Sequence, residues 1–154
     1  MGAGLIIAIL VVTLIGIIST PSNINTGALL ERKQAREISA VVNGAIIQRQ
    51  NYTLEFGQPL PTATWRESLN TQGAFLPELQ ELDWDYAVNG NGAHFCLSIE
   101  EPRRRAYFYS VFQETLTTAT FNGFVASTCG ATTSFSTTPD FTTTDVVLTI
   151  YAGR

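Results

Sequence analysis

The sequence predicts an α+β fold, in which a long N-terminal helix packs on an antiparallel β-sheet head that one disulfide closes. Three observations lead to this prediction. Residues 2–18 are uncharged and apolar, apolar side chains then recur at helical spacing as far as residue 50, and strand-like runs surround two cysteines in the C-terminal part. The 154 residues are enough for one small domain with an appendage, so we divide the chain into a segment 1–27 and a head 28–154.

The N-terminal segment reads GAGLIIAILVVTLIGII over residues 2–18, and Thr13 is its one polar side chain. As a helix it is about 25 Å long, which nearly crosses a bilayer core of about 30 Å. A helix that is apolar on every face is unusual in the core of a soluble protein. No Lys or Arg precedes the run, although a signal peptide carries a basic region there. We therefore expect a helix that is buried in a membrane or among copies of itself.

The charges that flank this segment are informative. The nearest cations are Arg32, Lys33 and Arg36, which follow it and by the positive-inside rule would place the rest of the chain in the cytoplasm. A disulfide, however, is typical of an oxidising compartment outside the cytoplasm. A basic leader that is cut away before Met1 reconciles the two. Our hypothesis is that Met1 begins a processed chain, and a gene without leader codons upstream of Met1 would contradict it.

A helix break is predicted between the apolar run and the next helix. Pro21 removes a backbone donor and clashes with the preceding turn, and the residues up to Gly27 favour turns. The helix can restart with Asn25 or Thr26 as N-cap. An amphipathic helix is then predicted over 28–52. Its charged residues are expected to lie mostly off the apolar stripe, and they are Arg32, Lys33, Arg36, Glu37 and Arg49. The stripe consists of Leu30, Ile38, Val41, Val42, Ala45 and Ile46.

The rest of the head divides into a connecting loop 57–83 and a sheet and disulfide region 84–154. Prolines and glycine interrupt the loop, although the Thr64 to Glu67 capping-box spacing predicts a short helix from Trp65. A β-hairpin is predicted around Asn89 and Gly90. In it Trp84, Tyr86 and Val88 share one face, and the return strand runs over 93–99.

A helix is predicted from Pro102 to residue 115, with Ala106, Tyr107, Val111 and either Phe108 or Phe112 facing the sheet. Strands are predicted over 121–127 and 145–151, the last near the centre of the sheet, with a surface loop over 131–144.

Few residues suggest chemistry. Two cysteines that are not in a CxxC spacing favour one structural disulfide over a zinc or redox site, and His94 is interpreted as an ordinary strand residue. Asp83 and Asp85 share a strand face, but calcium would need further oxygen ligands. Nucleotide-binding and hydrolase motifs are lacking. We therefore predict no catalytic residues, no metal and no cofactor, and a chain that is not an enzyme.

Three consecutive arginines, at positions 103–105, stand near Tyr107 and Tyr109, a combination that also occurs in nucleic-acid sites. In a chain with a net charge of -4, we regard nucleic acid as an unlikely partner. A solvated face is expected instead, or an ion pair between subunits with Glu100, Glu101 or the acidic region 78–85 as partner.

The N-terminal third resembles the N-terminal helix of type IV pilins. The likeness rests on the uncharged apolar start from Met1, on Pro21, and on the amphipathic continuation to about residue 50. It implies a pilin-like fold, removal of a basic leader by a prepilin peptidase, methylation, and a chain that melts near the proline in filaments. The pair Cys96 and Cys129 looks like the family's disulfide around a variable region. Most pilins carry glutamate at the fifth mature position, where this chain has Leu5, which points to a type IVb-like, divergent or minor pilin.

The resemblance implies a structural subunit of an extracellular pilus-like filament that can serve cell adhesion. Its partners would be copies of itself in a helical homopolymer, a bacterial inner membrane before assembly, and the pilus assembly machinery. Two alternatives stay open: a minor or tip pilin or pseudopilin of a secretion or DNA-uptake system, and a single-pass anchored periplasmic binding domain. The predicted filament-core residues are Gly2, Leu5, Ile6, Ile9, Val12, Thr13 and Gly16.

Overall fold

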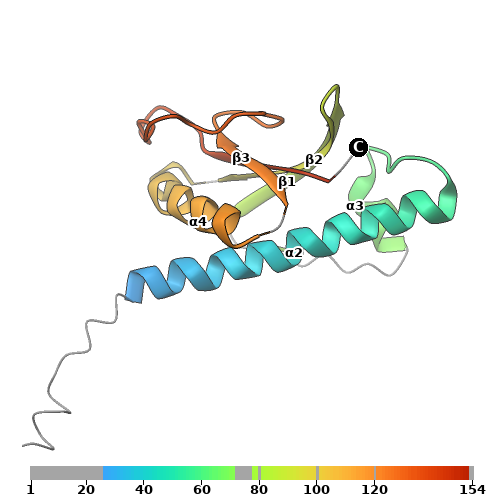
Figure 1. Cartoon of the computed structure of the whole chain (residues 1–154), viewed down its shortest axis with the longest axis horizontal. Helices are drawn as coiled ribbons and strands as arrows, with labels where there is room; N and C mark the ends of the chain where they lie inside the picture. The colour runs from blue at the N-terminus through green and yellow to red at the C-terminus, as the bar shows by residue number, and fades with distance from the viewer. Residues whose placement is uncertain (1–25, 72–77, 80, 100, 120, 153–154) are drawn as a thin grey trace, which may run out of the picture.

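A computed structural model describes residues 26–71, 78–79, 81–99, 101–119 and 121–152. The predicted filament-core residues, from Gly2 to Gly16, lie outside these ranges, as do Met1 and the predicted break at Pro21. The described part has an α+β architecture with a long N-terminal helix, a four-stranded antiparallel sheet and one disulfide. Figure 1 shows the long helix running along the base of the head, with the sheet above it.

The long helix, α2, spans Thr26–Phe56 and is about 46 Å long at 1.5 Å per residue. It includes the predicted helix 28–52 and begins one residue before Gly27, so that glycine lies in its first turn. Ile38, Val42 and Ala45 are fully buried, as the predicted stripe requires. Leu30 was wrongly included in that stripe, because its side chain is 58% exposed and lines an open groove beside Lys33 and Arg104.

The sheet has the strand order β1-β2-β4-β3, and every neighbouring pair is antiparallel. The strands are β1 (Leu82–Asn89), β2 (Gly92–Ile99), β3 (Asn122–Ala126) and β4 (Val147–Tyr151). The predicted hairpin is confirmed, since Asn89 pairs with Gly92 across a two-residue turn. The strand begins earlier than predicted, at Leu82 rather than Trp84, because Leu82 pairs with Ile99. The prediction of a central C-terminal strand is also confirmed, since β4 lies between β2 and β3.

One face of the sheet carries the core. Alternate residues of the strands point toward α2 and α4, as period-2 geometry requires. Val88 continues this alternation, but it is 53% exposed because it lies at the end of β1, beyond the helices. The inward residues of the four strands are Leu82, Trp84, Tyr86, Ala93, Phe95, Leu97, Val125, Leu148 and Ile150.

Two shorter helices complete the head. The predicted short helix is present as α3 (Trp65–Thr71), and the helix predicted from Pro102 is present as a 3-10 turn, η1 (Pro102–Arg104), that continues into α4 (Arg105–Thr118). Phe108, Val111 and Phe112 are fully buried. Ala106 was wrongly predicted to face the sheet. It is exposed because it lies two positions before Phe108, which places it on the other side of the helix.

Candidate assembly surface

Large apolar side chains lie exposed along the outward side of α2. Leu29 is 52% exposed, Ile47 is 54% exposed and Leu54 is 83% exposed. The intervals between them correspond to about five and about two turns of helix, so the three side chains form a single stripe. Ile38 and Val42 face the opposite way, into the core. Single exposed apolar residues are common in folded proteins, and these three share one side of α2 without forming a contiguous apolar patch.

Polar and small residues separate the members of this stripe. Lys33, Arg36, Ala40 and Gln50 are exposed on the same side of α2. The outward stripe is therefore amphipathic, and it suits intermittent contacts with a neighbour better than a continuous apolar seam. Within the described ranges, none of the helices combines the length and the apolar character that a bilayer crossing demands.

Polar contacts fix α2 to the head. In its first half, Tyr107 donates its hydroxyl to the amide oxygen of Gln34 over 2.7 Å. Further along, the Arg49 Nη1 group donates to the backbone oxygen of Ala152 at 2.8 Å, and its Nε group donates to the Tyr86 hydroxyl at 3.3 Å. These bonds hold α2 in a fixed position on the head, so the outward stripe has a fixed position too. Arg49 lies four positions after the buried Ala45, so helical periodicity places it on the buried side of α2, where its guanidinium meets these acceptors. The expectation that it lies off the apolar stripe is therefore wrong.

An open groove between α2 and α4 holds the second of the three arginines. The Nε of Arg104 lies 3.0 Å from a carboxylate oxygen of Glu81, and the contact is an ion pair because the N–H is not aimed as a hydrogen bond. The guanidinium lies 4.6 Å from the centre of the Tyr107 ring, within cation–π range. Burial raises the pKa of Tyr107, and the positive charge of Arg104 partly offsets the increase.

The three arginines do not form a shared cationic patch. Arg104 pairs with Glu81 of the predicted acidic region, but within the chain and not between subunits as expected, whereas Arg105 pairs with Asp145, two positions before β4. Arg103 is exposed. Two of the three positive charges are therefore committed to carboxylates of the head itself.

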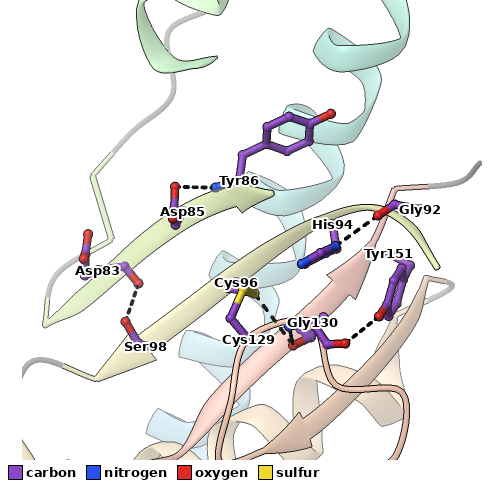
Figure 2. Close-up of a disulfide and its surroundings, with 11 residues drawn as sticks. Asp83, Asp85, Tyr86, Gly92, His94, Cys96, Ser98, Cys129, Gly130 and Tyr151 are labelled. Carbon is purple, nitrogen blue, oxygen red and sulfur yellow. Dashed lines mark hydrogen bonds between the residues drawn. A yellow bond between two sulfur atoms is a disulfide. The ribbon is translucent and has the colours of Figure 1, made fainter. Parts of the chain in front are cut away.

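Asp83 and Asp85 are exposed residues of β1, and Figure 2 labels both on that strand. Asp83 forms an ion pair with Arg66 at 3.6 Å, and Asp85 accepts a hydrogen bond of 2.7 Å from the backbone N–H of Tyr86. Each carboxylate thus has its own partner within the head. Asp83 links β1 to α3 through Arg66, whereas Asp85 bonds within β1, so the two carboxylates do not share a partner.

The second candidate region is the loop that follows β3 and lies on the outer face of the sheet. The disulfide Cys96–Cys129 is present and joins β2 to this loop. Next to it, the backbone N–H of Gly130 donates to the Thr149 hydroxyl at 3.1 Å, and the Tyr151 hydroxyl donates to the Gly130 carbonyl at 2.9 Å (Figure 2). The predicted loop 131–144 is confirmed as irregular structure.

His94 lies in β2 beside this disulfide and is only 2% exposed. Its Nδ1 contacts the Gly92 carbonyl at 3.1 Å, and its ring packs 5.3 Å from that of Tyr151. Its interpretation as a strand residue is confirmed, but its position beside Cys96 and Cys129 was not predicted. The available signal was the i, i+2 spacing of His94 and Cys96, which places both side chains on one face of a strand.

Comparison of the chain with protein-family models, with curated proteins and with solved structures gives no match.

Proposed function

We propose that this chain is a structural subunit of an extracellular filament similar to a type IV pilus. The observation that carries the proposal is the uncharged apolar run 2–18, which precedes a long helix fixed to a disulfide-closed head. The α+β architecture, with its long N-terminal helix on a four-stranded antiparallel sheet, is compatible with a pilin-like fold. In this proposal the apolar run lies in the inner membrane before assembly and in the filament core afterwards.

The driving force for such an exchange is packing. Lipid tails and a filament core are both apolar, so the hydrophobic effect contributes little to moving the helix from one to the other. Small residues allow helix backbones to approach closely, and the run contains Gly2, Ala3, Gly4, Ala8 and Gly16. The contacts would be heterologous, which is the interface type that produces open helical polymers.

The outward stripe of α2 would extend these contacts into the head. Leu29, Ile47 and Leu54 would each meet the helix of a neighbouring copy, and the polar residues between them would stay hydrated in the gaps. Leu5 cannot pair electrostatically with a neighbour's N-terminal amine as a glutamate can. Packing along the run and along the stripe therefore has to supply the stability of this polymer.

A charge in the middle of the run tests the proposal. Ile9→Lys is expected to abolish filaments, because a lysine there must be buried without a partner in the core. Filaments sheared from cells are counted by electron microscopy, and immunoblotting of the membrane fraction verifies that the subunit is made. Ile9→Leu and the exposed head change Ala106→Lys are the matched controls, and both should leave filaments intact. Normal filaments from the Ile9→Lys strain would refute the proposal.

Leu5 also favours a second candidate within the same class, a minor or tip subunit. Mass spectrometry of sheared filaments separates the two, because a major subunit forms the main band and a minor one is a trace component. An anchored binding domain would give neither result: the chain would stay in the membrane fraction and form no polymer.

A further inference from the structure

We propose that the reduced form of this protein binds one Zn²⁺ through His94, Cys96 and Cys129. One potential ligand atom from each of these residues lies within 4.8 Å of the other two. Two thiolates and an imidazole are a zinc ligand set, and water would take the fourth tetrahedral position. In the oxidised protein the disulfide occupies both sulfurs, so the site would exist only after reduction. The inference does not depend on filament formation.

The orientation of His94 is the first argument. His94 and Cys96 are two residues apart in β2, which directs both side chains to the outer face of the sheet. Since a carbonyl oxygen accepts only, the contact with Gly92 places the proton of the neutral ring on Nδ1 and leaves a lone pair on Nε2. Metal-bound histidines commonly donate their second ring N–H to a carbonyl in this way. Figure 2 shows the second ring nitrogen on the side of the disulfide.

The surroundings leave room for this nitrogen. A Cβ at Gly130 would lie 3.1 Å from His94 Nε2, and Gly130 also has a φ of +78°, which favours glycine. The residue after Cys129 thus allows the backbone of the loop to approach the imidazole closely. A side chain at position 130 would press against the imidazole and push His94 away from the two cysteine sulfurs.

Contacts other than the disulfide hold Cys129 in place. Gly130 makes two hydrogen bonds to β4: its N–H donates to the Thr149 hydroxyl, and its carbonyl accepts from the Tyr151 hydroxyl. Further along the loop, the backbone N–H of Phe135 donates to Val125 at 2.8 Å, and the Ser134 hydroxyl accepts from the Val125 N–H at 3.0 Å. Breaking the sulfur–sulfur bond therefore leaves several bonds that keep the two sulfurs close together.

The redox step is a two-electron reduction. A dithiol reductant, such as a thiol–disulfide oxidoreductase, transfers two electrons and two protons to the disulfide and is itself oxidised to a disulfide. The sulfur–sulfur bond breaks and two thiols form. Zinc then displaces both thiol protons and bonds to the thiolates and to Nε2. Bound zinc holds the two sulfurs as thiolates and so protects the reduced form of the site.

Cobalt titration of the full-length chain in detergent tests the site. The protein is reduced anaerobically with a phosphine and titrated with Co²⁺, and zinc then displaces the cobalt. We expect one equivalent of cobalt, with a thiolate charge-transfer band and the visible bands of tetrahedral coordination. The oxidised chain and a Cys129→Ser variant should lack the charge-transfer band of a two-thiolate site. His94→Gln should weaken zinc binding by about tenfold or more, which is at least the loss seen when metal-site residues outside the ligand shell are changed.

Several results would overturn the inference. One is a reduced chain that keeps its circular dichroism spectrum and takes up no cobalt. A second is zinc binding as tight in His94→Gln as in the unaltered chain, since this would reveal a pair of thiols without the imidazole. If reduction unfolds the head, failure of zinc to restore the native spectrum overturns it as well, and restoration that His94→Gln prevents supports it.

Discussion

The guanidinium of Arg49 joins the last third of the long helix to the residue that follows β4, through a 2.8 Å hydrogen bond from Nη1 to the backbone oxygen of Ala152. The two residues are 103 positions apart in the sequence. The same guanidinium reaches the Tyr86 hydroxyl of β1. One side chain of α2 therefore contacts β1 and the residue just after β4, which fixes the direction of the helix relative to the head.

Removing this link should destabilise the head. Arg49→Met keeps much of the aliphatic stem but loses the donors, and we expect the free energy of unfolding to fall by about 1.5–3 kcal/mol, as for hydrogen bonds made by charged groups. Urea denaturation followed by tryptophan fluorescence measures the change. Arg36→Met, on the exposed side of α2, is the matched control and should change it by less than about 0.5 kcal/mol. Equal effects of the two substitutions would contradict the assigned role of Arg49.

Tyr107 should make the stability of the head depend on alkaline pH. Burial raises its pKa above the ordinary value of 10.0, so the folded protein retains the phenol proton where the unfolded chain loses it. The stabilisation is fully present below pH 10 and is lost as the pH rises through the higher pKa of the folded state. Absorbance at 295 nm should show one tyrosine that ionises late, and Tyr107→Phe should remove this component. An unchanged titration in Tyr107→Phe would show that the late tyrosine is another one.

Asp140 should retain its turn in acid. Its pKa is lowered, chiefly because the Thr142 hydroxyl donates to the carboxylate at 2.7 Å and secondly because the Thr142 backbone N–H donates at 3.0 Å. The turn is stabilised above pH 3.8, the ordinary pKa, and loosens as the pH falls through the lower pKa of the folded state. The amides of 142–144 should therefore lose their protection against hydrogen exchange, relative to an unstructured chain at the same pH, only in strong acid. Asp140→Ala should remove this protection already at neutral pH. Equal protection in the variant would exclude this role.

The outward stripe should affect assembly and not folding. Ile47→Asp places a charge on a side chain that is 54% exposed, so the unfolding free energy should change by less than about 0.5 kcal/mol. If the stripe contacts a neighbouring copy, the number of filaments should fall. Gln50→Asp adds the same charge at an exposed polar position of the same side and serves as the comparison. Full assembly of the Ile47→Asp variant would remove the stripe from the proposed interface.

Local patterns were sufficient for the elements of the head. The Asn89-Gly90 turn signal, the apolar spacing of α2 and Pro102 at the start of the α4 segment each act within a few residues, so the hairpin and the helices follow from nearby sequence. Two cysteines likewise left a single possible pairing within the chain.

Partners that are distant in the sequence were decided only by the tertiary structure. Helical spacing places Arg49 on the inward side of α2, but its acceptors on Ala152 and Tyr86 come from distant parts of the chain. Leu30 stays exposed because its surroundings form an open groove rather than the core. His94 and Cys96 are two residues apart in β2, so their spacing is visible in the sequence. Cys129 and Gly130 reach His94 only because the loop after β3 folds back over β2. Neither periodicity nor spacing encodes such contacts, since they depend on how separate elements pack together.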